Sequence, residues 1–486
     1  MKNFIVLSMI SKEKSPVLFS PRRFLILLTS LMVMLSICMP PLSISHAQNE
    51  ELPVYIVQAG DTLSTIALRF NVSAEDLIAV NGITDANFVN VGDRLKVPGL
   101  EGISGELVSQ VIPLGVTLSS LSKMSGASAS DLVTLNKLTS PNEIIAGAKI
   151  IVPVTESSES IVYLNNYEVD NSSLAYAIKN RTSPWIIKEA NDLPNTIDLY
   201  ANEVYIKKSD GEDVVSLAPI FWDLALSPLP LVQGKTTKIE VSTGIAVDVN
   251  ASFDGQPIPI FRMDDDNTYI ALFGVHAMQS PGAYPMNFRL SLPTGSVFEM
   301  DQLVLVTEGG YLNDPEIYVN DVYVDPATIL EEDTIISQIV SGITPTIYWD
   351  GRFQSPIADP SCIVGYYGNR RSYNDGALLY YHTGIDFNVC VAENLYAYAP
   401  ANGQVVFAQS TIIRGNAVII DHGQGVYTGY WHLSEINVSP GDMLTTGDLI
   451  GTIGNTGRSA GPHLHFELIV NSVPVDPTDW LSRTYP

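Results

Sequence analysis

Histidines that could carry out chemistry are concentrated near the end of this sequence. The chain has 7 histidines in 486 residues, and five of them follow residue 380. These five are His382, His422, His432, His463 and His465. His463 and His465 stand in the segment HLHFELIV, which has the composition of a buried strand. Because residues i and i+2 of a strand point to the same side, the two imidazoles share one face, as a metal site or a catalytic pair requires.

The segment HTGID adds a nitrogen ligand and an oxygen ligand, His382 and Asp386. Zinc binds such side chains, and a catalytic zinc site has three protein ligands and one position left open for water. The sequence offers more than three candidates. We therefore expect some of these residues to hold a metal and others to act on the substrate.

The elements that must position these residues are short strands separated by glycine turns, such as NAVIIDHGQG, VYTGYWHLS and DLIGTIGNTG. Leu464 and Phe466 alternate with the paired histidines, so they should point into the core and keep the histidines aimed. His422 falls in the turn DHGQG and is expected to be structural. The pattern predicts an all-β body.

The segments HTGID, GYWHLS and GPHLHFEL occur in this order, and together they resemble the M23 family of zinc metallopeptidases, the LytM and lysostaphin type. The resemblance covers roughly residues 365–482 and implies an all-β peptidase domain over residues 351–486, with Zn²⁺ as its cofactor. The metal ligands that it implies are His382, Asp386 and His465. The catalytic residues that it implies are His432 and His463.

Imidazole chemistry fits this division of roles. Zinc lowers the pKa of a bound water from about 15.7 to roughly 7. A neutral imidazole with a pKa near ~6.5 can accept the proton of that water and pass it to the leaving amine. We assign the role of the base to His463. Either His432 or His463, once protonated, could stabilise the tetrahedral oxyanion.

Two of the three cysteines are predicted to form a disulfide. Cys362 and Cys390 are an even pair in a chain expected to be exported, where disulfides persist. The loop NVCVAENLY after Asp386 departs from the small-residue loop that is usual in the M23 family. A bridge would fasten the segment entering the peptidase domain to this loop. A second metal site at the two cysteines is the weaker alternative, because no partner ligands stand nearby in the sequence.

The first residues have the three regions of a signal peptide. Residues 1–47 contain five basic residues, the apolar run FLILLTSLMVMLSICM and small residues around Ala47. The apolar run has 16 residues, fewer than the ~20 of a membrane-spanning helix. An uncleaved anchor is the alternative. We expect a secreted or cell-envelope protein.

The charge of the chain argues against two classes of partner. The formal net charge is −26, and loss of residues 1–47, with five Lys or Arg and one Glu, makes it −30. So acidic a chain is repelled by nucleic acid and by anionic lipid surfaces. We expect no nucleic-acid partner, and no stable membrane partner unless the signal segment stays uncleaved.

A repeat follows the N-terminal segment. The residues from Tyr55 to Pro98 return after a shift of 55 residues, and nearly forty positions align without a gap. Each copy predicts a strand, two helices and a closing strand. Residues 53–98 resemble the LysM domain, and residues 108–153 resemble a degenerate LysM domain. A fainter third copy is predicted within residues 160–230.

The resemblance to LysM implies binding to the N-acetylglucosamine chains of peptidoglycan or chitin. The groove would be formed by two strand–helix loops, with the residues Gly60, Asp61, Thr62, Asn81, Gly82 and Ile83. The second copy has Val116 in place of Asp61 and lacks the aromatic residue at Phe70. A role as a stable spacer is therefore the alternative there.

The middle of the chain changes to short alternating strands separated by turns. Residues 235–306 predict a β-sandwich that resembles an immunoglobulin-like domain. Residues 307–350 are mixed and acidic, and we expect a connecting segment. The acidic turn at residues 264–266 could bind calcium, although a solvated hairpin tip is the favoured interpretation.

The sequence therefore predicts a multidomain, mainly β protein with βααβ LysM modules, an immunoglobulin-like sandwich and an M23 peptidase domain. We expect an exported zinc-dependent endopeptidase that cleaves peptidoglycan stem peptides or cross-bridges while LysM modules hold it on the glycan. The alternative is a non-catalytic cell-wall-binding or amidase-activating protein. M23 relatives of that kind typically lose zinc ligands, whereas this chain keeps all three, so the enzyme is favoured.

Overall fold

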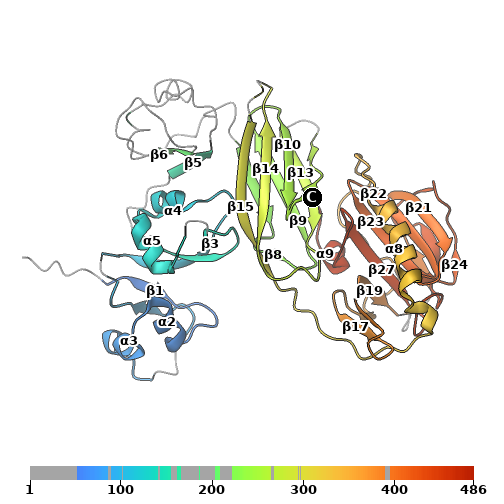
Figure 1. Ribbon diagram of the computed structural model, residues 1–486, viewed down its shortest axis with the longest axis horizontal. Helices are drawn as coiled ribbons and strands as arrows, with labels where there is room; N and C mark the ends of the chain where they lie inside the picture. Colours follow the sequence, from blue (N-terminus) through green and yellow to red (C-terminus); the bar gives the residue numbers. More distant parts are fainter. Residues whose placement is uncertain are drawn as a thin grey trace, which may run out of the picture. The chain divides into compact units, whose positions relative to one another are not determined.

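The structure is a computed structural model (Figure 1). It describes residues 52–85, 89–100, 102–140, 143–154, 161–165, 185, 203–207, 222–263, 267–293, 295, 297–388 and 394–486. The predicted signal peptide, the acidic turn at residues 264–266 and Cys390 lie outside the described residues. No helix in the part that the structure describes is long and apolar enough to cross a membrane.

The two repeats near the N-terminus fold as βααβ modules, as predicted (Figure 1). The first consists of β1 (Val54–Ile56), α2 (Leu63–Phe70), α3 (Ala74–Asn81) and β2 (Arg94–Lys96). The second consists of β3 (Glu106–Val111), α4 (Leu118–Ser125), α5 (Ala129–Asn136) and β4 (Lys149–Val154). Threonine side chains at equivalent positions, Thr62 and Thr117, cap α2 and α4. The four strands join in one sheet in the order β2-β1-β3-β4.

The predicted third repeat lies mostly outside the described residues. Its described parts include the strands β5 (Ile161–Asn165) and β6 (Glu203–Lys207), which pair with each other. Near the end of the predicted range lies β7 (Trp222–Ser227), which pairs with β9 (Thr236–Thr243) of the sandwich. The sandwich therefore begins before residue 235, because β7 is needed to extend one of its sheets.

Two sheets form the sandwich, and every strand pair in them is antiparallel except the parallel pair of β8 and β15. One has the order β11-β10-β14-β15-β8 and the other β12-β13-β9-β7. The further strands are β8 (Leu231–Val232), β10 (Asp248–Phe253), β11 (Gln256–Ile258), β12 (Phe261–Arg262), β13 (Thr268–Gly274), β14 (Gly282–Ser291) and β15 (Val297–Thr307).

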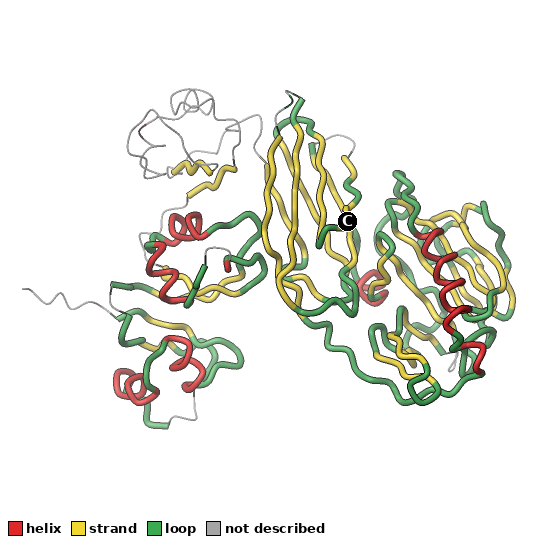
Figure 2. Tube along the Cα trace, in the orientation of Figure 1, coloured by secondary structure: helices red, strands yellow, loops and turns green. Residues whose placement is uncertain are grey.

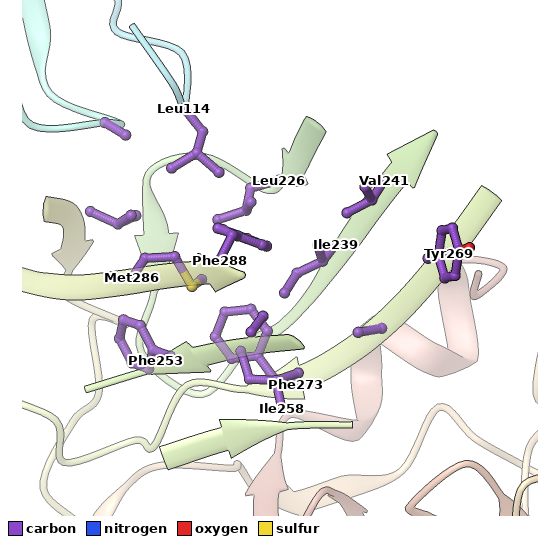
Figure 3. Close-up of a cluster of buried hydrophobic side chains, with 14 of the residues drawn as sticks. Leu114, Leu226, Ile239, Val241, Phe253, Ile258, Tyr269, Phe273, Met286 and Phe288 are labelled. Atoms are coloured by element: carbon purple, nitrogen blue, oxygen red, sulfur yellow. The ribbon is translucent and has the colours of Figure 1, made fainter. Parts of the chain in front are cut away.

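The sandwich core follows from alternation along the strands. Ile239 and Val241 of β9 are buried and alternate with half-buried polar residues. They pack with Phe273 and Phe288 between the sheets (Figure 3). A β-sandwich is confirmed, while its immunoglobulin-like type stays a prediction.

The region predicted to be a peptidase domain, residues 351–486 and here named the peptidase region, is built on one eight-stranded sheet, with the order β16-β19-β27-β23-β22-β21-β25 and β28 paired to β27. Its strands are β16 (Ile363–Gly365), β19 (Gly384–Phe387), β21 (Gly403–Ser410), β22 (Asn416–Gly423), β23 (Val426–Leu433), β25 (Met443–Leu444), β27 (Leu464–Val470) and β28 (Val473–Val475). Strands dominate this region, as predicted (Figure 2).

Smaller elements border this sheet. They are the pair β17 (Arg370–Tyr373) and β18 (Leu378–Tyr381), the sheet of β20 (Tyr396–Tyr398), β26 (Leu449–Thr452) and β24 (Glu435–Ile436), and the helix α9 (Pro477–Ser482). The core on one side of β27 contains Leu464 and Phe466, both fully buried, as the alternation predicts.

The segment predicted as a connection, residues 307–350, carries a structural element of the peptidase region. It contains the short 3-10 helix η2 (Asp321–Tyr323) and the 15-residue helix α8 (Pro326–Val340). Ile336 and Val340 of α8 pack on Trp431 and Ile469 of the large sheet (Figure 1). Ile469 alternates with Leu464 and Phe466, so α8 covers the face of β27 that carries His465.

Candidate active site

Three predicted metal ligands converge at the junction of two neighbouring strands. Asp386 on β19 stands directly opposite His465 on β27, and His382 lies two residues before β19. The atoms His382 Nε2, Asp386 Oδ1 and His465 Nδ1 are each 2.9 Å from the other two. All three residues are buried. The structure thus brings together the three ligands that the sequence predicts.

Hydrogen bonds behind the two histidines fix which nitrogen carries the proton. Nδ1 of His382 is 2.9 Å from the carbonyl oxygen of Tyr366, so Nδ1 must donate and Nε2 is left without a proton. Nε2 of His465 is 3.1 Å from the Glu467 carboxylate, so Nε2 donates and Nδ1 is left bare. Both bare nitrogens face the centre of the triangle.

This triangle fits a divalent cation. Two bare nitrogens and a carboxylate oxygen repel one another at 2.9 Å unless positive charge lies among them. Burial lowers the pKa of His465, but the carboxylates of Asp386 and Glu467 outweigh burial and raise it. The site therefore favours positive charge. Two imidazoles and one carboxylate are also the ligand types of catalytic zinc.

The carboxylate of Asp386 is held in its ionised form. Burial by itself raises the pKa of Asp386, but His382 and His465 outweigh it and hold that pKa well below its usual value. Arg371 Nη2 donates to Oδ2 of Asp386 at 2.8 Å, and Arg371 Nε donates to Asp314 at 2.9 Å. Arg371 thus holds one oxygen of Asp386 and leaves Oδ1 directed at the triangle.

The two predicted catalytic histidines lie beside the triangle. Nε2 of His463 is 3.5 Å from Asp386 Oδ1. The rings of His463 and His432 have centroids 4.9 Å apart. His432 has a φ of 66°, a left-handed conformation that is uncommon outside glycine and that clusters at functional sites. The structure therefore gathers all five predicted site residues of this region in one place.

Both of these histidines also present a bare nitrogen. Nδ1 of His463 donates to the carbonyl of Gly461 at 2.8 Å, and Nδ1 of His432 donates to the carbonyl of Thr456 at 2.8 Å. Their Nε2 atoms are therefore without protons in the neutral rings. Burial lowers the pKa of His463, and it holds the pKa of His432 well below its usual value with help from His463 and His465. Both rings are neutral at neutral pH and can accept a proton.

Two residues that support the site, Glu467 and Arg371, were not predicted from the sequence. Glu467 orients His465, and its Oε1 also accepts from the Thr383 hydroxyl. Glu467 stands two residues after His465, so the strand alternation that paired the histidines could have found it. Arg371 precedes Asp386 by fifteen residues on another strand, and no spacing signal in the sequence points to it.

Two cavities flank the site. One, of about 380 Å³, is lined by Asp386, His432 and His463 together with Ile317, Val319, Val364, Arg371, Tyr373, Asn388 and residues 458–462. The other, of about 60 Å³, is lined by His382, His432 and His465 together with Arg371, Arg414, Arg458, Glu467, Ile329 and Asp333 of α8, and neighbouring residues. The larger cavity contacts both Asp386 and the proposed base, so it is the candidate substrate cleft.

Of the two cysteines predicted to form a disulfide, only Cys362 lies within the described residues. Cys362 is disulfide-bonded, and its carbonyl accepts from the backbone N–H of Asn388 at 2.9 Å. This contact places Cys362 beside Asn388, which precedes Cys390 by two residues in the sequence. The pairing with Cys390 itself stays a prediction, because Cys390 lies outside the described residues.

Two of the predicted glycan-binding side chains have internal partners. The carboxylate of Asp61 accepts from the Tyr55 hydroxyl at 2.6 Å and from the backbone of Gln58 at 2.8 Å. The side chain of Asn81 bonds to the backbone of Leu77 and of Lys96. Asp61 therefore shapes the first loop, and Asn81 ties α3 to β2.

The other predicted glycan residues keep a surface position. Thr62 is exposed, Ile83 is half-buried, and Gly60 and Gly82 have φ values of 87° and 62°. A glycan bound to this module would have to contact Gly60, Thr62, Gly82, Ile83 and the backbone. Asp61 and Asn81 would support such contacts by holding the loops in shape. Binding by this surface stays a prediction.

Comparisons with known proteins agree with the site. Residues 380–477 match the model of peptidase family M23, and residues 55–98 and 115–153 match the LysM domain. The peptidoglycan DD-endopeptidase ShyA of Vibrio cholerae is 43% identical over 95 residues, which are 20% of this chain and 22% of that protein. The DD-carboxypeptidase/endopeptidase Mpg of Neisseria meningitidis is 43% identical over 96 residues, with the same shares. The chain thus spans about a fifth of the length of these relatives.

Solved structures also match this chain, with low TM-scores. The antimicrobial peptidase lysostaphin from Staphylococcus simulans is 35% identical, with a TM-score of 0.19 over 21% of this chain and 43% of that chain. A zinc-containing peptidase from Vibrio cholerae is 14% identical, with a TM-score of 0.26 over 89% of this chain and 99% of that chain.

Proposed function

We propose that this chain, whose residues 380–477 belong to peptidase family M23 and whose residues 55–98 and 115–153 belong to the LysM family, is a zinc-dependent endopeptidase of peptidoglycan. One observation carries the proposal: His382 Nε2, Asp386 Oδ1 and His465 Nδ1 lie 2.9 Å from one another, beside the rings of His432 and His463. Relatives named as peptidoglycan DD-endopeptidases support the same substrate.

Three residues would hold the zinc: His382 through Nε2, Asp386 through Oδ1 and His465 through Nδ1. Bound there, zinc would supply Lewis acidity, which makes water a better nucleophile and polarises a peptide carbonyl. Glu467 and Tyr366 keep the two imidazoles in the tautomers that binding requires. Arg371 keeps Asp386 oriented.

His463 acts as the general base in this proposal. Its bare Nε2 faces Asp386, and its lowered pKa keeps the ring neutral at neutral pH, so it can take a proton from the attacking water. The same imidazole can then pass the proton to the leaving amine. The ring centroid of His432 lies 4.9 Å from that of His463, with the two ring planes tilted by 53°. His432 can share the proton transfer, and once it is protonated it can stabilise developing negative charge.

The two LysM modules would hold the enzyme on the glycan. Attachment raises the local concentration of peptide bonds around the peptidase region even where each module binds weakly. The signal peptide predicted at residues 1–47 supports export, and peptidoglycan as substrate supports action at the cell envelope or outside the cell. The proposed partner is thus peptidoglycan, through its glycan chains and its peptides.

Digestion of purified peptidoglycan tests the proposal. Mass spectrometry of the soluble products should show muropeptides with newly exposed amines, and a chelator should abolish them. Asp386→Ala should release no muropeptides, whereas the exposed control Asp350→Ala should act like the wild type. A zinc-loaded wild type that binds the wall but releases nothing would favour the alternative, a non-catalytic wall-binding or amidase-activating protein.

A further inference from the structure

Three arginines line the small cavity beside the metal-binding triangle, and they differ in charge environment. Arg371 forms ion pairs with Asp314 and Asp386. Arg414 forms ion pairs with two acidic residues of α8, Glu332 and Asp333. Arg458 has no carboxylate partner within 4.0 Å among the residues that the structure describes. It is therefore the arginine of the three whose charge is not neutralised by a close carboxylate.

Arg458 is nevertheless held firmly. Its guanidinium lies over the rings of Tyr373 and Tyr380, with Cζ 4.9 Å and 5.4 Å from the two centroids. Nη1 donates to the carbonyl of Tyr323 at 3.3 Å. Because a guanidinium has five N–H donors, most of the donors of Arg458 are still available to a ligand. Stacking on two rings orients the planar group before any ligand arrives.

The loop that carries Arg458 is fixed to the catalytic histidines. The carbonyl of Thr456, two residues before Arg458, accepts from Nδ1 of His432. The hydroxyl of Ser459, the next residue, lies 3.2 Å from Nδ1 of His463. The backbone N–H of Arg458 donates to the carbonyl of Ile413 at 2.7 Å. These bonds tie the backbone on both sides of Arg458 to the two histidines.

Arg458 also reaches both cavities that flank the site. It lines the cavity of about 380 Å³ together with His463 and Asp386, and the cavity of about 60 Å³ together with His382 and His465. A peptide that enters either cavity to reach the triangle therefore meets a wall that includes this guanidinium. In a chain of net charge −26, an unneutralised cation at this point selects for an anionic group.

We propose that Arg458 forms a carboxylate-binding subsite, which recognises a free carboxylate of the substrate peptide close to the scissile bond. The inference rests on the proposed function, and it names the substrate class. Arginine and carboxylate form charge-assisted, often bidentate hydrogen bonds. Cross-links in which a diamino acid keeps a free carboxylate are then preferred over uncharged glycine bridges and over peptides whose carboxylate is amidated.

The test compares two soluble cross-linked stem-peptide dimers that differ in one group. One carries a free carboxylate on its diamino acid, and the other carries the amide. The zinc-loaded wild type should cleave the free acid with a kcat/KM about ten- to a hundredfold higher than the amide. Arg458→Gln should bring this ratio close to one. Arg458→Lys, which keeps the charge but loses the planar fork, should give an intermediate ratio.

Arg352→Gln is the matched control, because Arg352 is exposed and lines neither cavity. It should keep the wild-type ratio. Three results would overturn the inference and leave the proposed function standing. The wild type could cleave both dimers equally, the Arg458→Gln variant could keep the wild-type ratio, or that variant could cleave neither dimer. A zinc-loaded wild type that cleaves neither dimer nor intact peptidoglycan overturns the proposed function, and the inference with it.

Discussion

At the scale of single residues, the groups behind each histidine decide what the histidine can do. Carbonyl oxygens accept from Nδ1 of His382, His432 and His463, and the carboxylate of Glu467 accepts from Nε2 of His465. Each ring is left with one bare nitrogen for a metal or a proton. A carboxylate behind a metal-binding imidazole also increases its basicity.

Replacement of Glu467 should therefore weaken metal binding. Glu467→Gln removes the negative charge while keeping the shape, and we expect zinc affinity to fall by roughly tenfold or more. Competition with a chromophoric chelator measures this without reference to activity. The exposed control Glu435→Gln should bind zinc like the wild type. Equal affinity in Glu467→Gln and the wild type would show that Glu467 does not support the site.

His422 makes a different prediction, about stability and pH. It is fully buried, with Nδ1 near the carbonyl of Asn402 and Nε2 near the hydroxyl of Thr428. Burial lowers the pKa of His422 to about 4, although the bond to Asn402 opposes this. Between pH 6.5 and pH 4 the unfolded chain binds a proton at His422 that the folded chain does not. Stability therefore falls as the pH falls through this window.

His422→Gln should remove that contribution. The free energy of unfolding of the wild type should fall more steeply between pH 6.5 and pH 4 than that of the variant, by about 3 kcal/mol over the window. Urea unfolding of the purified protein at several pH values, followed by tryptophan fluorescence, measures the difference. Parallel pH dependences in the two proteins would mean that His422 is not kept neutral by its burial.

At the scale of elements, strand alternation was predictable and long-range pairing was not. Along β27, His465 points to one face of the sheet, and Leu464 and Phe466 point to the other. This could be predicted because the two-residue period of a strand depends only on the local sequence. The helix α8 was missed because Glu332 and Asp333 make its sequence resemble a solvated linker. Their partners, the backbone of Ile413 and the side chain of Arg414, lie about eighty residues away and cannot be inferred from local pattern.

The packing of α8 gives a matched pair of substitutions. Ile336 is 6% exposed and packs on the large sheet, whereas its neighbour Ile335 is 41% exposed. Ile336→Ala should lower the free energy of unfolding of this region by about 2–5 kcal/mol, because it leaves a cavity in the core. Ile335→Ala should cost far less. Equal effects in thermal or urea unfolding would show that α8 does not pack on the sheet as described.

At the scale of the whole molecule, the proposed function assigns glycan binding to the LysM modules and catalysis to the peptidase region, and competition can separate the two roles. Soluble N-acetylglucosamine oligomers should slow the digestion of intact peptidoglycan, because they occupy the LysM modules and remove the gain in local concentration. They should not slow cleavage of a soluble peptide dimer that lacks glycan. Slowing of both reactions, or of neither, would contradict a separate anchoring role.

The central claim is that one zinc, held by His382, Asp386 and His465, makes this chain an endopeptidase of peptidoglycan. Titration of the metal-free protein with zinc, while muropeptide release is followed by mass spectrometry, tests it most directly. We predict no release without metal, a linear rise up to one zinc per chain, and a plateau beyond that point. Full release by the metal-free protein, or no release at any zinc concentration, would contradict the account.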